Sequence, residues 1–209
     1  MTAGKRVYRS PLREEQARRT RAAVLEAAAR CFLDRGYAAT TMRDVADAAG
    51  VSVQTVFGQG SKAALLLGCV DRAVVGDDDA VALAEREPFL RFVEAPDRAG
   101  KLAALGDLAR RYIPRANSMG VVFAAAAAGD PEIAEAWEEY ERRRRADTRV
   151  LVASLEPWLR DGLDVEAATD ILCGAFSDAT IDALVRRRRW TLDRYVDFLV
   201  DAVERLLLR

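Results

Sequence analysis

The segment TTMRDVADAAGVSVQTVF, residues 40–57, decides the fold of the N-terminal part of this chain. Thr41 is followed three residues later by Asp44, the spacing of a capping box, so a short helix begins after Thr41 and ends at the glycine that follows. Ser52 is a typical cap for a second short helix, over 52–57. A turn of about 3–4 residues with glycine lets two such helices cross steeply. The region from Thr40 to Lys62 therefore predicts a helix-turn-helix.

The polar residues of the second helix, Ser52, Gln54 and Thr55, are expected to face outward, because the apolar residues of both helices are needed to hold the pair together. A glutamine amide pairs with an adenine edge, and serine and threonine reach bases or phosphates. Thr41, Arg43 and Lys62 stand at or near helix starts, where backbone N–H groups attract phosphate. The segment thus predicts DNA binding; the alternative is two ordinary short helices with capped ends.

Outward from this segment, helix signals recur and strand alternation is almost absent. Proline is scarce, and alanine, leucine and arginine are abundant. We expect an all-α fold with helices over 11–35, 61–75, 97–113, 115–128, 131–160 (broken or kinked at Pro157), 164–187 and from 192 almost to the C-terminus, with 77–96 forming a loop that contains a short helix.

Charge is distributed unevenly although the formal net is −1. Residues 1–76 hold 12 Lys/Arg against 7 Asp/Glu, and residues 77–209 hold 20 against 26. A basic front on an acidic body is typical of a protein whose N-terminal part contacts polyanions. Residues 1–20 form a basic arm that either follows DNA phosphates or is a solvated tail.

Several function classes are disfavoured by composition. The chain has no histidine, which removes the common general base and the commonest metal ligand, and its carboxylates are not grouped. Its three cysteines are widely spaced and form no metal or disulfide pattern. No apolar run is long enough to span a bilayer, and none follows the basic start as in a signal peptide. We therefore expect a cytoplasmic protein that is not an enzyme and has no cofactor or metal.

Residues Arg21–Leu66, including AAVLEAAARCFLDRGYAATTMRDVADAAGVSVQTVF and the SKAALL that follows, resemble the N-terminal domain of TetR-type (tetracycline-repressor-like) regulators. The resemblance implies a three-helix DNA-binding domain, here 21–76, and a helical effector-binding and dimerisation domain, here 77–209. It also implies a homodimer through the last two helices. The implied function is a ligand-responsive regulator, more often a repressor, that a small-molecule effector releases from a double-stranded DNA operator.

One segment departs from the family's pattern. The family follows the recognition helix with Tyr, two variable positions, Phe, another position, Ser or Thr, and Lys. Here Phe57-Gly58-Gln59-Gly60-Ser61-Lys62 is one residue shorter and lacks the second aromatic residue. Phe57 also lacks the hydroxyl that would contact a phosphate. The alternative function is therefore a helical ligand-binding dimer with weakened or lost DNA binding.

The C-terminal part offers candidates for an effector pocket and an interface. Aromatic and apolar residues of the middle helices are either pocket lining or plain core: Tyr112, Met119, Phe123, Trp137, Tyr140 and Phe176. Apolar stripes on the last two helices suit packing inside the chain or across a two-fold axis. Two four-arginine runs, Arg142–Arg145 and Arg186–Arg189, are interpreted as paired or helix-end charges rather than one basic face.

Overall fold

The computed structural model describes residues 11–75 and 83–209, and within these ranges the chain is helical, with only an isolated bridge between Leu159 and Leu208. The expected all-α fold is confirmed. The chain divides into two compact units, Met1–Cys69 and Val70–Arg209. The boundary expected between residues 76 and 77 lies outside the described residues, and the domain limits expected from the sequence stay a prediction. No helix of the described ranges is long and apolar enough to cross a membrane.

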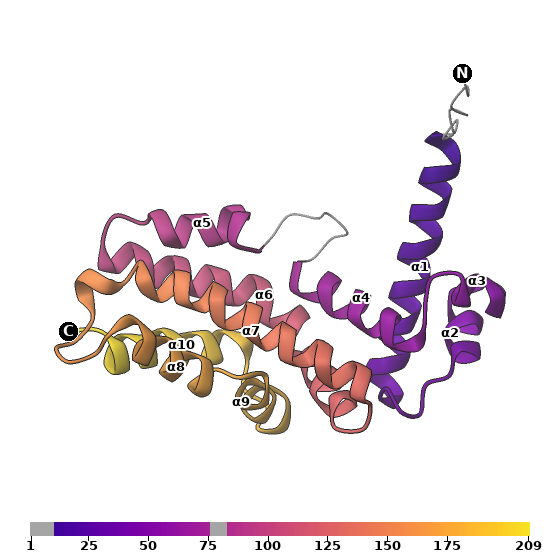
Figure 1. Cartoon of the computed structure of the whole chain (residues 1–209). Helices are drawn as coiled ribbons and strands as arrows, with labels where there is room; N and C mark the ends of the chain where they lie inside the picture. The colour runs from indigo at the N-terminus through magenta and orange to yellow at the C-terminus, as the bar shows by residue number, and fades with distance from the viewer. Residues whose placement is uncertain (1–10, 76–82) are drawn as a thin grey trace, which may run out of the picture. The chain divides into compact units, whose positions relative to one another are not determined.

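The first unit contains α1 (Pro11–Arg35), α2 (Met42–Ala49), α3 (Val53–Phe57) and the first half of α4 (Lys62–Val75). α2 packs against α1, and α3 packs against α2 (Figure 1). α1 ends as predicted at Gly36, whose φ of 80° is accessible to glycine at little cost. The core of this unit is made of fully buried side chains from all four helices: Val24, Phe32, Val45, Val56, Leu65 and Leu66.

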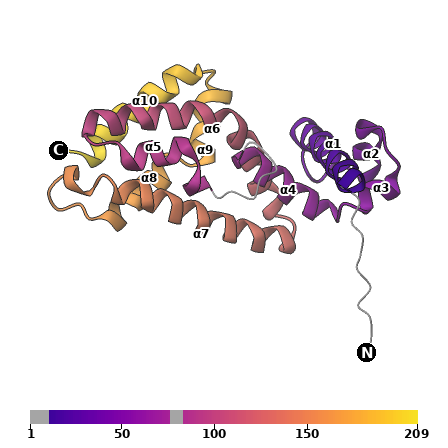
Figure 2. The ribbon, with the colours of Figure 1, turned by 90° about the horizontal axis from the view of Figure 1, so that it is seen from above.

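The second unit is a bundle around two long helices, α6 (Arg98–Ala127) and α7 (Pro131–Ala153). α6 contacts α5, α7, α9 and α10, and α7 also contacts α8. In Figure 2, α10 lies beside α6 at one edge of this unit, and α7 lies at the other. The remaining elements are η1 (Leu83–Glu85), α5 (Glu87–Glu94), η2 (Glu156–Trp158), α8 (Val165–Ala175), α9 (Asp178–Ile181), η3 (Asp182–Arg187) and α10 (Leu192–Leu207).

The predicted break between 113 and 115 is wrong, since α6 continues through Pro114. A proline inside a helix removes one backbone hydrogen bond and costs about 3 kcal/mol. Here the helix buries Leu105 and Ala109 before the proline and Met119 and Phe123 after it. Packing on both sides of the proline therefore outweighs the local cost.

The predicted helix over 164–187 is also wrong in its extent. It begins after Asp164 as expected, but α8 ends at Ala175, and Ser177 caps a new helix by accepting a hydrogen bond from the Thr180 amide. A serine hydroxyl competes for backbone N–H groups and favours such caps over helix interiors. The interruption directs Asp178 toward α6, where Asn117 donates a hydrogen bond to the Asp178 carbonyl at 2.7 Å.

The helix predicted over 131–160 ends early, at Ala153, and Pro157 lies in the 3₁₀ turn η2. The α-helix is thus broken before Pro157, as predicted, but already at the C-cap Ser154, and Glu156 and Pro157 continue in the 3₁₀ turn. α10 begins at its predicted cap, Thr191, which accepts a hydrogen bond from the Arg194 amide. The segment 77–96, expected to be a loop with a short helix, contains η1 and the short helix α5 in its described part.

Candidate DNA-binding surface and ligand cavity

The capping box predicted at the start of α2 is present. The Thr41 hydroxyl accepts a hydrogen bond from the Asp44 amide at 3.1 Å, and the Asp44 carboxylate accepts one from the Thr41 amide at 2.8 Å. Arg35, at the end of α1, donates to the same carboxylate at 2.7 Å. Bonds from Thr41, with a smaller contribution from Arg35, lower the pKa of Asp44. These contacts fix α2 against α1.

The turn between α2 and α3 depends on Gly50, which adopts φ 66° and ψ 32°. Its N–H donates to carbonyls of the last turn of α2, and the Val51 N–H donates to the Ala46 carbonyl at 3.1 Å. A residue with a side chain is strained in this left-handed conformation. The glycine therefore sets the angle at which α3 leaves α2.

Ser52, the N-cap of α3, and the α3 residues Gln54 and Thr55 differ in how many of their hydrogen-bonding groups remain free for a bound molecule. Ser52 accepts a hydrogen bond from the Thr55 amide at 3.0 Å, and the two hydroxyls lie 2.8 Å apart. Gln54 is exposed, and no residue of the described ranges hydrogen-bonds its amide. Gln54 thus offers both a donor and an acceptor to a bound molecule, whereas Ser52 and Thr55 mainly hold the helix start.

Two predicted phosphate contacts occupy different surroundings. Arg43 is exposed on α2 and has no ion-pair partner in the part of the chain that the structure describes. Lys62 is half-buried; its ammonium donates to the carbonyls of Tyr37 at 3.0 Å and Thr40 at 3.1 Å and lies 4.2 Å from the centre of the Tyr37 ring. Arg43 is therefore available to an anion, while two of the three Lys62 donors already bind the chain.

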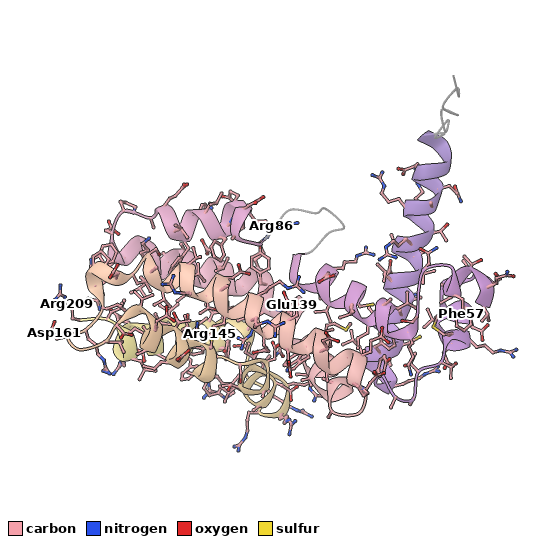
Figure 3. The ribbon with its side chains drawn as sticks, viewed as in Figure 1. Phe57, Arg86, Glu139, Arg145, Asp161 and Arg209 are labelled. Atoms are coloured by element: carbon pink, nitrogen blue, oxygen red, sulfur yellow. The ribbon has the colours of Figure 1, made fainter. Side chains whose placement is uncertain are left out.

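The shortened segment after α3 is an ordered turn. The amides of Gln59 and Gly60 donate to the carbonyls of Val56 and Phe57 at 2.9 and 3.1 Å. Gly60 has φ 129°, and a Cβ there would lie 2.9 Å from the Ala64 Cβ, so glycine is required. Phe57 remains 60% exposed (Figure 3).

Arg21 makes a contact that no sequence pattern suggests. It reaches from α1 to the turn after α3, where its guanidinium donates to the Gln59 carbonyl at 3.4 Å. No local rule indicates a bond over 38 positions. Of the arm predicted over 1–20, residues 1–10 lie outside the described ranges. Residues 11–20 belong to α1, where Arg18 and Arg19 both pair with Glu15.

The second unit contains a cavity of about 500 Å³ between α6, α7 and α10. Three of the six residues predicted for an effector pocket, Tyr112, Tyr140 and Phe176, line it. The apolar part of its wall includes Phe89, Leu105, Ile113, Leu151, Ile181 and Leu199. A mainly apolar cavity of this size suits a small organic molecule.

The other three predicted residues, Met119, Phe123 and Trp137, are not among the lining residues. Phe123 is buried, and its ring lies edge-on to Trp137 at a centroid distance of 5.1 Å and to Tyr140 at 5.7 Å. Edge-to-face pairs at these distances stabilise a core. Phe123 and Trp137 therefore support the Tyr140 side of the cavity from behind, and Met119 is plain core.

The polar lining of the cavity was not predicted. It consists of Asp71 on α4, Arg143, Arg144, Asp147 and Thr148 on α7, and Tyr195 on α10. On α7 the lining residues recur at three- and four-residue spacing from Tyr140 to Leu151, which places them on one face of the helix. That periodicity is in the sequence, but it does not tell an inward face from a solvated one.

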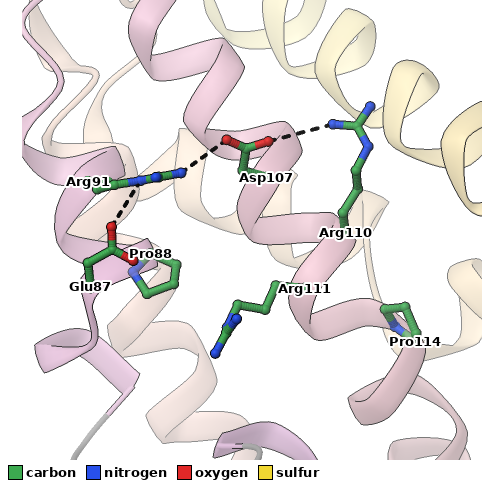
Figure 4. Close-up of a pocket in the computed structure, with 7 residues that line it drawn as sticks. All are labelled: Glu87, Pro88, Arg91, Asp107, Arg110, Arg111 and Pro114. Carbon is green, nitrogen blue, oxygen red and sulfur yellow. Dashed lines mark hydrogen bonds and ion pairs between the residues drawn. The ribbon is translucent and has the colours of Figure 1, made fainter.

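A second hollow, of about 570 Å³, is lined by α5 and α6 (Figure 4). Four of its charged side chains pair with one another: Arg91 pairs with Glu87 at 3.4 Å and with Asp107 at 3.1 Å, and Arg110 lies 3.9 Å from Asp107. The fifth, Arg111, has no ion-pair partner among the described residues. The side chains of these four residues are all largely exposed. The hollow therefore lacks the apolar wall that a ligand site needs.

Two short helices joined by a glycine turn, with an exposed glutamine on the second, define a helix-turn-helix DNA-binding domain. Residues 24–69 match the family model of bacterial regulatory proteins, tetR family. The N-terminal unit is therefore a tetR-family DNA-binding domain.

Solved structures share the fold over nearly the whole chain. A protein assigned to the TetR family of transcriptional regulators from Mesorhizobium loti is 24% identical, with a TM-score of 0.65, and the alignment covers 93% of this chain and 99% of that one. NalD, the secondary repressor of the MexAB-OprM multidrug efflux pump in Pseudomonas aeruginosa, is 20% identical (TM-score 0.62; 93% and 98% covered). A protein assigned as a transcriptional regulator from Saccharomonospora viridis, in complex with choline, is also 20% identical (TM-score 0.70; 91% and 98% covered). The comparison with curated proteins gives no match.

Proposed function

We propose that this chain is a ligand-responsive transcriptional regulator, a repressor that a small-molecule effector releases from its DNA operator. The observation that carries the proposal is the tetR-family helix-turn-helix with an exposed, unengaged glutamine on α3. The repressor NalD, which shares the fold, supports the regulatory role. The choline complex of another protein of this fold supports the binding of small molecules.

In the proposed complex, α3 enters the major groove and Gln54 reads a base edge. Ser52 and Thr55 hold the start of α3 and present it to phosphate, and Arg43 and Thr41 contact the backbone on either side. Phe57 lies against the sugar-phosphate chain as an apolar contact. Lys62 acts mainly as a positioning residue, because its ammonium is bound to the loop before α2.

The cavity of the second unit is the proposed effector site. α4 links it to the DNA-binding unit in sequence: Lys62 is bound in the first unit, and Asp71, nine residues later on the same helix, lines the cavity. A helix transmits displacement along its length, so an effector that moves Asp71 biases the position of the reading helix.

The functional unit is proposed to be a homodimer through the last two helices, because one short reading helix recognises few base pairs and two-fold symmetry doubles the site. Most of the apolar stripe predicted on the last helix, Tyr195, Val196, Leu199 and Val203, is buried within the chain itself. The residues that remain for an interface are the exposed apolar ones: Ile171 on α8 and Phe198 and Leu206 on α10. We place the protein in the cytoplasm and assign it no enzymatic activity.

The alternative function, a helical ligand-binding dimer with weakened DNA binding, is favoured by the segment after α3. Phe57 offers no hydroxyl to a phosphate, and the turn that follows is short. A chain of this kind would bind small molecules but discriminate poorly between DNA sequences.

Selection from a pool of random duplexes distinguishes the two functions. The full chain is incubated with duplexes of about 30 base pairs, long enough for two half-sites a helical turn or two apart, and the bound fraction is amplified and sequenced. We expect an inverted repeat to be enriched, which also tests the dimer.

Two charge reversals accompany this selection: a test variant on α2 and a matched control on α7. Arg43→Glu, on α2, should abolish enrichment. Arg142→Glu, exposed on α7 and paired with Glu139, should select the same sequence as the wild type. If the wild-type chain enriches no sequence, the regulator proposal is overturned and the alternative function is favoured.

A further inference from the structure

The cavity in the second unit holds two carboxylates that the chain leaves without partners. Asp71 and Asp147 both line it, and no residue of the described ranges forms a hydrogen bond or ion pair with either. Asp71 is exposed and Asp147 is half-buried. Partial desolvation raises the pKa of both carboxyl groups, and the charge of Arg143 opposes this effect. Carboxylates that face an apolar wall in this way are stabilised by a cation.

The arginines that share the cavity lining have their own partners. Arg144 binds both oxygens of Glu141, at 3.1 and 2.9 Å, and Arg143 lies 3.4 Å from Glu139. Glu139 and Glu141, which do not line the cavity, therefore offset the charges of Arg143 and Arg144, although Arg143 also acts on Asp71 and Asp147. Taken together, these four carboxylates outnumber the two arginines, and the net charge around the cavity is negative.

A third group in the cavity points independently to a ligand. Tyr195 is 0% exposed and lines the cavity, yet its hydroxyl has no hydrogen-bond partner in the described structure. The charge of Asp178 acts on Tyr195, and one buried carboxylate oxygen of Asp178, Oδ2, also has no hydrogen-bond partner in the described structure. Buried polar groups are normally paired, and leaving one unpaired is costly.

Aromatic rings complete the chemistry of the wall. Phe89, Tyr112, Tyr140 and Phe176 line the cavity beside the carboxylates. The face of an aromatic ring attracts a positive charge, and its surface packs against an apolar body. Carboxylates and ring faces together select for charge without requiring many hydrogen-bond donors on the ligand.

We propose that this cavity takes an organic cation, a quaternary or protonated group on an apolar, ring-sized body, held by Asp147 and Asp71 and packed against the tyrosine and phenylalanine rings. The hydroxyl of Tyr195 offers a hydrogen bond to any polar substituent of the ligand. This inference rests on the proposed function only in taking the cavity as the effector site.

The test uses two ions of nearly the same shape and opposite charge, tetraphenylphosphonium and tetraphenylborate. Each is titrated calorimetrically into the full wild-type chain at physiological salt. We expect the cation to bind at least about tenfold more tightly than the anion, a difference of about 1.4 kcal/mol. The two carboxylates attract the cation and repel the anion, and both effects contribute to this difference. Equal affinities, tighter binding of the anion, or binding of neither ion would overturn the inference.

Matched variants assign the effect to the cavity. Asp147→Asn and Asp71→Asn keep the side-chain shape and remove the charge, and each should weaken cation binding several-fold. Asp161→Asn changes a carboxylate that is 95% exposed, beside Arg209 in Figure 3, and should leave binding unchanged. Unchanged cation affinity in both cavity variants overturns the inference, and thermal unfolding confirms that each variant is folded.

Failure of this inference and failure of the proposed function are distinguishable. The same preparations are used for the duplex selection, which does not depend on any effector. A chain that enriches an inverted repeat but binds no cation contradicts only the assignment of ligand class. A chain that binds the cation and enriches no DNA contradicts the regulator proposal and keeps the cavity assignment.

Discussion

Phe57, at the end of α3, shows how one side chain sets the strength of DNA binding in the proposed complex. It is 60% exposed, and in TetR-type domains this position usually carries a tyrosine whose hydroxyl contacts a phosphate. Phe57→Tyr should therefore tighten DNA binding without changing the preferred sequence. One exposed hydrogen bond to phosphate is worth about 1 kcal/mol, or roughly a fivefold gain in affinity.

The measurement is fluorescence anisotropy with the selected duplex and with an unrelated duplex of the same length. Phe57→Leu is the control, because it changes the side chain without adding a hydroxyl. Both duplexes should gain affinity for the tyrosine variant, since phosphate contacts carry no sequence information. If the tyrosine and leucine variants bind equally, Phe57 does not face a phosphate.

Individual residues were predictable where the chemistry is local. Thr41, Asp44 and Ser52 follow from the short-range rules of helix caps, and the structure confirms their bonds. The positions of Tyr195 and Asp147 in the cavity wall were not predicted, because they depend on packing beside residues distant in sequence. A sequence pattern indicates which residues share a helix face but not which of them remain without a partner.

At the scale of elements, Lys62 ties the beginning of α4 to the loop between α1 and α2. Lys62→Met keeps the apolar stem and removes both hydrogen bonds to the Tyr37 and Thr40 carbonyls. Without these two bonds, the free energy of unfolding should fall by about 1–3 kcal/mol. At about 2–4 °C per kcal/mol for a chain of this size, the midpoint of thermal unfolding should decrease measurably.

Salt dependence separates this positioning role from a phosphate contact. Removal of one phosphate contact lowers the slope of log affinity against log salt by about one. Arg43→Ala should lower this slope, whereas Lys62→Met should leave it unchanged and reduce stability. A lower slope for Lys62→Met, with no decrease in stability, would assign Lys62 to the DNA backbone instead.

Helix ends were predicted well where a cap or a left-handed glycine marks them, as at Thr191 and Gly36. The two errors in the predicted helix bounds, at Pro114 and at Ser177, have one cause. Pro114 indicates a break, yet α6 continues, and nothing in 164–187 indicates the interruption at Ser177. In both places, packing against helices distant in sequence overrides the local preference for continuing or ending a helix. Local sequence patterns do not indicate that packing.

At the scale of the whole molecule, the chain joins a tetR-family DNA-binding domain to a helical unit that contains a cavity of about 500 Å³. The family resemblance and the all-α class were accessible from the sequence because one segment carries a specific motif. Three of the six residues proposed for an effector pocket line this cavity and the other three do not, and the pocket assignment stays a prediction. The charge of the cavity, which bears most on ligand class, depends on which carboxylate each arginine binds, and the local sequence does not indicate those partners.

Base-specific reading by Gln54 is the claim on which the proposed function depends most. The direct measurement is a cycle that combines two proteins, wild type and Gln54→Ala, with two duplexes, the selected one and one in which the A·T pair of each half-site is replaced by G·C. The control variant is Gln16→Ala, which removes an exposed glutamine of α1. We predict that the wild type and Gln16→Ala prefer the selected duplex by about 1–3 kcal/mol per paired contact, and that Gln54→Ala loses this preference while retaining its affinity for unrelated DNA. An equal decrease in affinity on every duplex would contradict base-specific reading.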